Sequence, residues 1–227
     1  MTNFQKLVYS IAHSLNDDSF LSCIRMLCNY KFVNRESLNI KLQQILNNLK
    51  VIETAQDYFT ELKAASFLSQ IRGVNHLVFS EIPDILINFY NYKITVEVKR
   101  FRYRTLQDSE MENKLSSNAG ELIEYGNPLE IQTQVDDVIK SKLNSYKGID
   151  PYYLYLWSDS PHIVEDCEIK AAVNFLRRNN SFVFNKIKGI FYKYNGLPLS
   201  LIIFENSHIN TILKNIFIES KWNVTEK

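Results

Sequence analysis

Charged side chains that could take part in chemistry lie close together in the stretch 80–104. A Pro-Asp pair at 83–84 opens one apolar run, and a second apolar run carries Glu97 and Lys99, two positions apart. Residues two apart in a β-strand point to the same face, so this carboxylate and this ammonium should lie side by side. The strand is apolar enough to be buried, and burying an unpaired charge is costly. The pattern therefore requires something that compensates both charges.

Asp84 supplies a second carboxylate if the runs before and after Asn91 pair as a hairpin. The pairing that we expect sets Asp84 opposite Lys99 and close to Glu97. Two carboxylates and an ammonium then converge at one end of the hairpin. A hard divalent cation such as Mg²⁺ prefers carboxylate oxygens and keeps several of its waters. Bound magnesium would neutralise both carboxylates, and the same carboxylates would compensate the ammonium.

The Pro-Asp pair followed by Glu97-Val98-Lys99 resembles the signature of the PD-(D/E)xK nuclease superfamily. The resemblance covers about residues 54–157 and implies that Asp84 and Glu97 bind the metal together with the Val98 carbonyl oxygen. The metal would be Mg²⁺, with Mn²⁺ as a substitute. Lys99 would orient or activate the attacking water and stabilise the negative charge that develops on the phosphate.

Two further positions follow from the same resemblance. Many members carry an acidic residue on the helix before the first strand, and Glu61 matches it; it would bind the metal directly or through water. Some members also place a glutamine on the helix after the Glu-x-Lys strand. Gln132 and Gln134 are the candidates here, and Gln134 is assigned to nucleic-acid binding, although the tyrosine that accompanies this glutamine in one branch is absent.

Arginines follow the motif at alternate positions, as Arg100, Arg102 and Arg104. Guanidinium groups suit phosphate forks, and the aromatic residues between them suit base stacking. These arginines are therefore candidate nucleic-acid contacts. Strand alternation sets them on the face opposite Lys99, so either the chain turns back near Arg100 or they serve another surface. A solvated strand end is the alternative explanation.

Hydrophobic periodicity indicates the elements that must position these residues. Apolar residues recur at helical spacing before residue 50, with a break at 16–19 and no Gly or Pro before Gly73, which predicts a helical N-terminal third. A further helix is expected to begin at Thr54, with Asp57 as its capping partner. The remaining expected elements are strands at 76–81, 84–90, 93–101 and 152–157, a loop at 105–129, helices at 130–147, 164–178 and 208–219, and a hairpin of 187–194 with 199–205.

This order predicts an α/β fold: a restriction-endonuclease-like mixed sheet flanked by helices, with an αβββαβ core. Residues 1–50 would form a helical N-terminal extension and residues 51–227 the nuclease-like domain. The extension is a candidate surface for a second copy of the chain or for a partner protein.

Composition bounds the function further. The chain has 227 residues, 45% of them apolar, and a net charge of +1, so nucleic-acid contacts must use a local basic patch. Three cysteines form no CxxC pair and are expected to be reduced thiols. No run approaches the ~20 apolar residues of a membrane span. We expect no membrane association and a cytoplasmic location.

These observations predict a Mg²⁺-dependent phosphodiesterase acting on DNA, with endonuclease action favoured over exonuclease action and RNA as an alternative substrate. Restriction, repair and defence are the candidate roles. The alternative is a catalytically inactive nucleic-acid-binding or assembly module on the same fold. The explanation without function is a surface hairpin with a Glu97–Lys99 ion pair, which would contribute little to stability.

Overall fold

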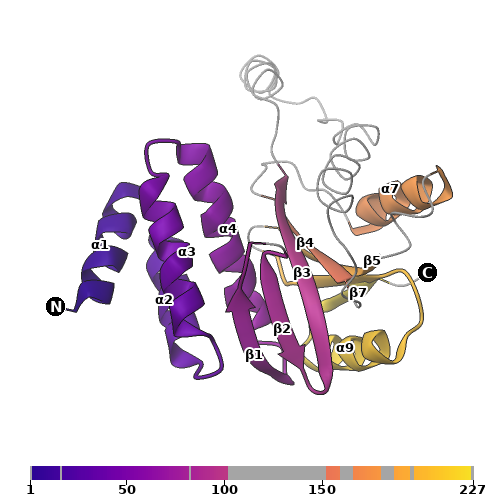
Figure 1. The fold of residues 1–227 in the computed structure, drawn as a ribbon. Helices are drawn as coiled ribbons and strands as arrows, with labels where there is room; N and C mark the ends of the chain where they lie inside the picture. The colour runs from indigo at the N-terminus through magenta and orange to yellow at the C-terminus, as the bar shows by residue number, and fades with distance from the viewer. Residues whose placement is uncertain are drawn as a thin grey trace, which may run out of the picture.

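The protein forms a seven-stranded mixed sheet with helices on both faces (Figure 1). The sheet order follows the chain order from β1 to β7. β1–β2–β3 and β5–β6 pair antiparallel, whereas β3–β4–β5 and β6–β7 pair parallel. The α/β class with a mixed sheet is therefore confirmed. The computed structural model describes residues 2–15, 17–81, 83–101, 152–158, 166–179, 187–194 and 197–225.

Helices occupy most of the chain before the sheet, as the sequence predicts. α1 ends at Leu15, directly before the predicted break at 16–19, and α2 begins inside that break, at Asp18. The predicted start of the fourth helix was wrong by two residues: it begins at Ile52, and the Ala55 N–H donates to the Val51 carbonyl at 3.1 Å, so Thr54 is already inside the first turn. The four helices are α1 (Asn3–Leu15), α2 (Asp18–Asn29), α3 (Arg35–Asn47) and α4 (Ile52–Leu68).

The strands and later helices that fall within the described residues lie within two residues of their predicted bounds, and the predicted hairpin is the β5–β6 pair. The short strand β7 was not predicted. The predicted loop at 105–129 and helix at 130–147 lie outside the described residues. The elements are β1 (Val74–Phe79), β2 (Ile85–Phe89), β3 (Tyr92–Phe101), β4 (Tyr152–Ser158), α7 (Asp166–Asn179), β5 (Ile187–Tyr194), β6 (Ser200–Ile203), α9 (His208–Glu219) and β7 (Asn223–Thr225).

A two-residue turn of Tyr90 and Asn91 joins β2 to β3. Tyr90 has a left-handed φ of 50°, and its N–H donates to the Gly73 carbonyl at 2.8 Å. Gly73 has a φ of +99°, and a Cβ there would lie 2.2 Å from the Tyr90 ring. Only glycine allows both this conformation and this close approach, so Gly73 helps to fix the tight turn.

The register of the β2–β3 hairpin differs from the predicted register. Ile85 pairs with Val96, and one further step along the same register sets Asp84 opposite Glu97. The sequence prediction, which set Asp84 opposite Lys99, was therefore wrong by two residues. The corrected register moves Asp84 from the last residue of the Glu-Val-Lys motif to the first, Glu97.

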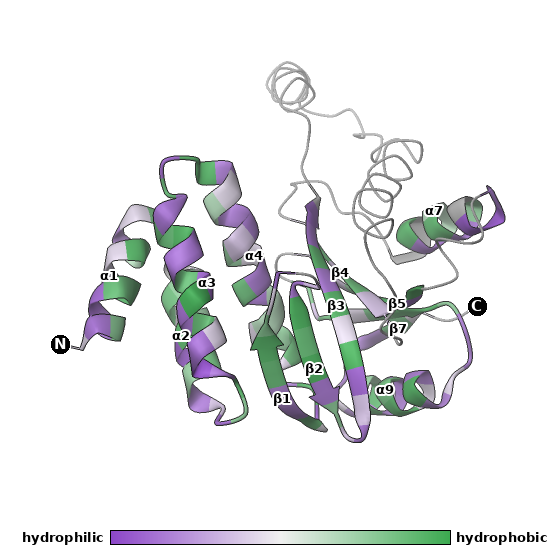
Figure 2. Cartoon of the chain, viewed as in Figure 1, coloured by the Kyte–Doolittle hydropathy of each residue, from purple (hydrophilic) through white to green (hydrophobic). Residues whose placement is uncertain are grey.

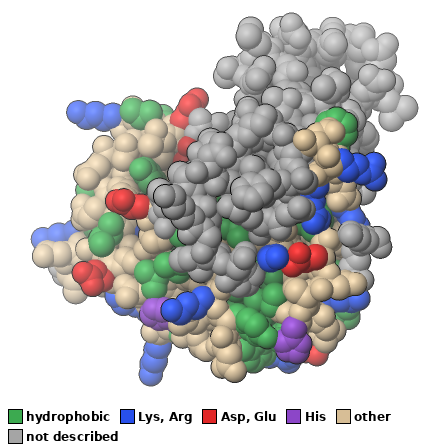
Figure 3. Space-filling view, turned by 45° about the vertical axis from the view of Figure 1, so that its right-hand side comes forward, with side chains coloured by type: hydrophobic (Ala, Val, Ile, Leu, Met, Phe, Trp, Pro, Cys, Tyr) green, Lys and Arg blue, Asp and Glu red, His purple; other side chains and the backbone are tan. Residues whose placement is uncertain are grey.

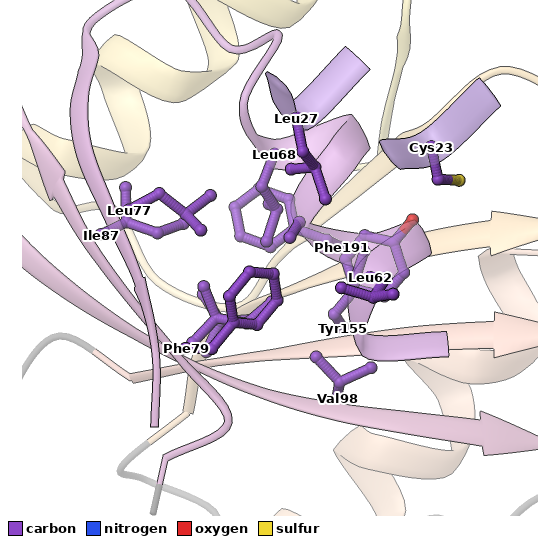
Figure 4. Packing of buried hydrophobic residues seen from close by; sticks show 14 of the residues in the cluster. Cys23, Leu27, Leu62, Leu68, Leu77, Phe79, Ile87, Val98, Tyr155 and Phe191 are labelled. Carbon is purple, nitrogen blue, oxygen red and sulfur yellow. The ribbon is translucent and has the colours of Figure 1, made fainter. Parts of the chain in front are cut away.

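One large hydrophobic cluster fills the space between the sheet and the helices α1–α4 and α9, and a second lies beneath α7. Figure 4 shows Cys23 of α2 and Leu62 of α4 packed with Tyr155 and Phe191 of the sheet. Hydrophobic residues run along β1 and β2, while the C-terminal end of β3 is hydrophilic (Figure 2). The hydrophilic C-terminal end of β3 is therefore a candidate location for a functional site.

Candidate active site

A cavity of about 450 Å³ lies between α4 and the C-terminal end of β3. β2 begins at Ile85, opposite Val96, so β3 continues beyond the end of its antiparallel neighbour. The last residues of β3 and one side of α4 enclose the cavity. The described residues that line it are Thr54, Asp57, Tyr58, Thr60 and Glu61 of α4 and Val98, Lys99 and Arg100 of β3.

Asp84 is buried at the point where β2 and β3 separate. Its Oδ2 accepts a hydrogen bond from the Val98 N–H at 2.8 Å, and its own carbonyl accepts from the Ser80 N–H at 3.0 Å. The carboxylate therefore takes the place of a strand partner beyond the end of β2. The same hydrogen bond joins Asp84 of the Pro-Asp pair to Val98, the middle residue of the Glu-Val-Lys motif.

Glu97 and Lys99 share one face of the sheet, because β3 remains regular through Phe101. In the parallel register, Glu97 pairs with Leu154 and Lys99 with Leu156, two residues of the cluster beneath α7. Glu97 is only 1% exposed, whereas Lys99 is half-buried and lines the cavity. The carboxyl group of Glu97 is thus buried, as the sequence predicts.

Glu61 lines the cavity from α4 and forms a buried ion pair with Lys41 of α3, with Nζ and Oε2 2.5 Å apart. The Lys41 ammonium also lies 4.9 Å from the centre of the Tyr58 ring. Sequence analysis missed Lys41. The available signal was its position three residues after Leu38 on the apolar side of α3, where a lysine needs a partner.

Arg100 points toward α4, on the face opposite Lys99. Its guanidinium donates to Gln56 Oε1 at 2.6 Å and lies 3.7 Å from Asp57 Oδ1. Arg100 and Lys99 both line the cavity, so the cavity opens around the edge of β3. Of the predicted nucleic-acid contacts, Arg100 is therefore at the site. Arg102, Arg104 and Gln134, together with Gln132, lie outside the described residues.

The donor set at this place fits magnesium chemically. Mg²⁺ takes one or two carboxylates from a protein and keeps waters for its other positions. Asp84 and Glu97, with the Val98 carbonyl, are hard oxygen donors on adjoining positions of the hairpin. Within the described ranges, no group of three or more His, Cys, Asp or Glu side chains is gathered closely enough to hold a metal ion.

Burial shifts the pKa of three groups that do not line the cavity. Burial raises the pKa of the Cys23 thiol and of the Tyr155 hydroxyl, and burial lowers the pKa of the Lys193 ammonium. These three residues do not line the cavity. The shifts accompany packing around the main hydrophobic cluster and do not mark a second site.

In comparisons with known proteins, no family model, curated protein or solved structure matches this chain. No helix in the described part of the chain combines the length and apolar character needed to cross a bilayer. Basic and acidic side chains are both present on the visible surface in Figure 3, in keeping with the net charge of +1.

Proposed function

We propose that the chain is a metal-dependent nuclease that hydrolyses DNA phosphodiester bonds on a restriction-endonuclease-like fold. The observation that carries the proposal is the hydrogen bond from the Val98 N–H to Asp84. It joins the two halves of the motif beside a cavity that Glu61 and Lys99 line. The order α4-β1-β2-β3 and the parallel pairing of β3 with β4 support the proposed fold.

Each residue has a distinct role in this proposal. Asp84, Glu97 and the Val98 carbonyl hold the cation, which when bound supplies Lewis-acid stabilisation of the phosphate. The Lys99 ammonium orients the attacking water and stabilises the negative charge that develops on the phosphate oxygens. The water oxygen forms a new bond to phosphorus as the bond to the leaving deoxyribose oxygen breaks, and the proton that the water gives up is balanced by protonation of that leaving oxygen. Arg100 contributes positive charge at the cavity wall for the DNA backbone.

A catalytically inactive binding or assembly module is the second candidate. The observation that favours it is that protein groups already engage two carboxylates at or beside the cavity: Val98 N–H binds Asp84, and Lys41 pairs with Glu61. Such contacts would also stabilise a fold that has no reaction to perform. Binding of DNA without cleavage would identify this alternative.

The test is incubation of the full chain with supercoiled and linear DNA in Mg²⁺, in Mn²⁺ and in chelator. We expect nicked circles with either metal and intact DNA with chelator. Degradation from the ends of linear DNA alone would indicate exonuclease action instead. Intact DNA under every condition, with a matched RNA substrate also intact, would contradict the proposed activity.

A further inference from the structure

Lys41 occupies a position where a charge is costly. It lies on the buried side of α3 beside Leu38 and Leu42, and only 4% of its side chain is exposed. An ammonium loses its hydration there and must be paired to remain charged.

The contacts of Lys41 lead to the cavity wall. Its ammonium pairs with Glu61 and lies over the face of Tyr58, two residues that stand about one turn apart on α4 and both line the cavity. Lys41 itself is not among the described lining residues. Lys41 therefore has no described contact with the cavity itself, and it contacts two residues that line the cavity, Glu61 and Tyr58.

Stability alone is a weak reason for such a pair. Replacement of a buried ion pair by apolar side chains of similar volume is often neutral or stabilising, because desolvation offsets the attraction. Glu61 is different from an ordinary buried acid because its residue lines the cavity. Asp84 and Glu97 are not among the described lining residues, so the charges of Glu61 and Lys41 would act on a cation held by Asp84 and Glu97 through space and not as ligands.

We propose that Lys41 is a positioning residue that acts as the counter-charge of Glu61 and thereby sets the affinity of the site for a divalent cation. This inference rests on the proposed function. Lys41 holds the Glu61 carboxylate in place and cancels its charge, which leaves Asp84 and Glu97 to determine cation binding. Loss of the ammonium alone removes one positive charge from the immediate surroundings of the Glu61 carboxylate. Loss of both charges restores the original balance.

The experiment measures Mn²⁺ binding to the intact chain by electron paramagnetic resonance, without any substrate. Lys41→Met should bind Mn²⁺ roughly three- to tenfold more tightly than wild type, because a nearby positive charge is gone. Lys41→Arg keeps the charge and should stay within roughly twofold of wild type. The double variant Lys41→Met, Glu61→Leu should also stay within roughly twofold.

Lys63→Met is the matched control. Lys63 is also a largely buried lysine paired with a carboxylate, Asp17 at 3.5 Å, but it does not line the cavity. Its loss should leave Mn²⁺ affinity unchanged. If Lys41→Met does not fold, Glu61→Gln takes its place: it leaves the ammonium without the carboxylate charge and should bind Mn²⁺ roughly three- to tenfold more weakly, with unchanged affinity read as for Lys41→Met.

Three outcomes overturn the inference and are distinguishable. Unchanged Mn²⁺ affinity in folded Lys41→Met, with clear binding by wild type, overturns the counter-charge role and leaves the nuclease proposal standing. A loss of affinity above roughly tenfold in the double variant shows that the Glu61 charge is needed in spite of Lys41. Absence of Mn²⁺ binding by wild type removes the proposed metal-dependent function together with the inference.

Discussion

Asp84 combines two tasks in one side chain. Its Oδ2 accepts the Val98 N–H where β2 ends, so the carboxylate secures the separation of the two strands. Its negative charge would attract a bound cation. Because an amide oxygen accepts the same hydrogen bond, Asp84→Asn removes the charge while keeping the local structure. This distinction makes Asp84 the most informative single residue of the site.

Arg100→Ala should weaken DNA binding. The guanidinium lines the cavity and is held by Gln56, so it is preorganised for a backbone phosphate. Loss of one phosphate contact should reduce the slope of log affinity against log salt by about one. Fluorescence anisotropy with labelled duplex in Ca²⁺ gives both quantities.

Arg72→Ala controls for the change in net charge. Arg72 is an exposed arginine that pairs with Glu219 at 2.7 Å and does not line the cavity. Its loss should leave the salt slope as in wild type. Equal slope changes in the two variants would show that Arg100 acts only through net charge.

Single-residue reasoning from sequence reached part of the site. The motif singled out Asp84, which accepts from the Val98 N–H, and Lys99, which lines the cavity; strand alternation correctly set Arg100 on the opposite face from Lys99. Lys41 was out of reach because its partner Glu61 is on another helix. Hydrophobic periodicity identifies a buried position, but it does not say which distant side chain compensates a charge there.

At the scale of elements, the N-terminus of α2 offers a defined interaction. Asp17 caps the helix: Oδ1 accepts from the Ser19 N–H at 2.8 Å and from the Ser19 hydroxyl at 2.6 Å. Oδ2 lies 3.5 Å from the Lys63 ammonium, which joins the cap of α2 to α4. Burial alone would raise the pKa of Asp17, but the bonds from Ser19 and the charge of Lys63 hold it below its ordinary value of 3.8.

Asp17→Ala should lower the free energy of unfolding by about 1 kcal/mol near neutral pH, which is typical for loss of an N-cap. A carboxyl whose pKa is lower in the folded state contributes stability above its unfolded pKa and loses it on protonation. The deficit of the variant should therefore shrink as pH falls below 3.8. Urea unfolding of both proteins at pH 6 and pH 3 measures this, and a constant deficit would contradict the account.

Element positions were predictable from sequence, whereas their register was not. The β-rich runs and the helical spacing gave the strands β1–β6 and the helices α7 and α9 within two residues of their bounds, whereas the break between α2 and α3 was not predicted. The β2–β3 register depends on the contact between Tyr90 and Gly73, which come from different parts of the chain. The strand β7 has three residues, too few for alternation to be recognised.

At the scale of the whole molecule, the helical extension and the sheet share one core. Leu42 and Ile45 of α3 belong to the same hydrophobic cluster as Val96 and Val98 of β3. The Lys41–Glu61 pair crosses the predicted boundary after residue 50 as well. The extension is therefore packed directly behind the candidate site.

The segment 51–227 expressed alone should lack a cooperative unfolding transition. Removal of α1–α3 would expose apolar residues of α4 such as Phe59, which is buried in the full chain and whose ring centroid lies 5.3 Å from that of Phe20 in α2. Thermal unfolding followed by circular dichroism, with the full chain as control, measures this. A sharp transition in the truncated chain would instead show that the sheet domain folds independently.

Association through the extension stays a prediction. The first 52 residues expose the large apolar side chains of Tyr9, Leu21, Ile40, Val51 and Ile52. These residues belong to α1, α2, α3 and the start of α4. Single exposed apolar residues are normal on a protein surface, and a docking face requires a continuous patch.

The central claim is that Asp84 and Lys99 perform chemistry at the end of β3, and it is tested most directly by separating binding from cleavage. Asp84→Asn and Lys99→Ala are compared with wild type on one DNA substrate. Cleavage is measured in Mg²⁺, and affinity is measured by filter binding in Ca²⁺ on the same preparations. Both measurements are needed because interactions that exist only along the reaction path lower turnover without lowering affinity.

We predict that both variants lose cleavage while their DNA affinity stays within roughly threefold of wild type. Asp84→Asn should bind DNA at least as tightly as wild type, since it removes repulsion between a carboxylate and the phosphates. An amide is a poorer ligand than a carboxylate for a hard cation, so cleavage should not recover at high Mg²⁺. Cleavage by both variants at the wild-type rate would contradict the account, because the active site would then lie elsewhere or the protein would not be a nuclease.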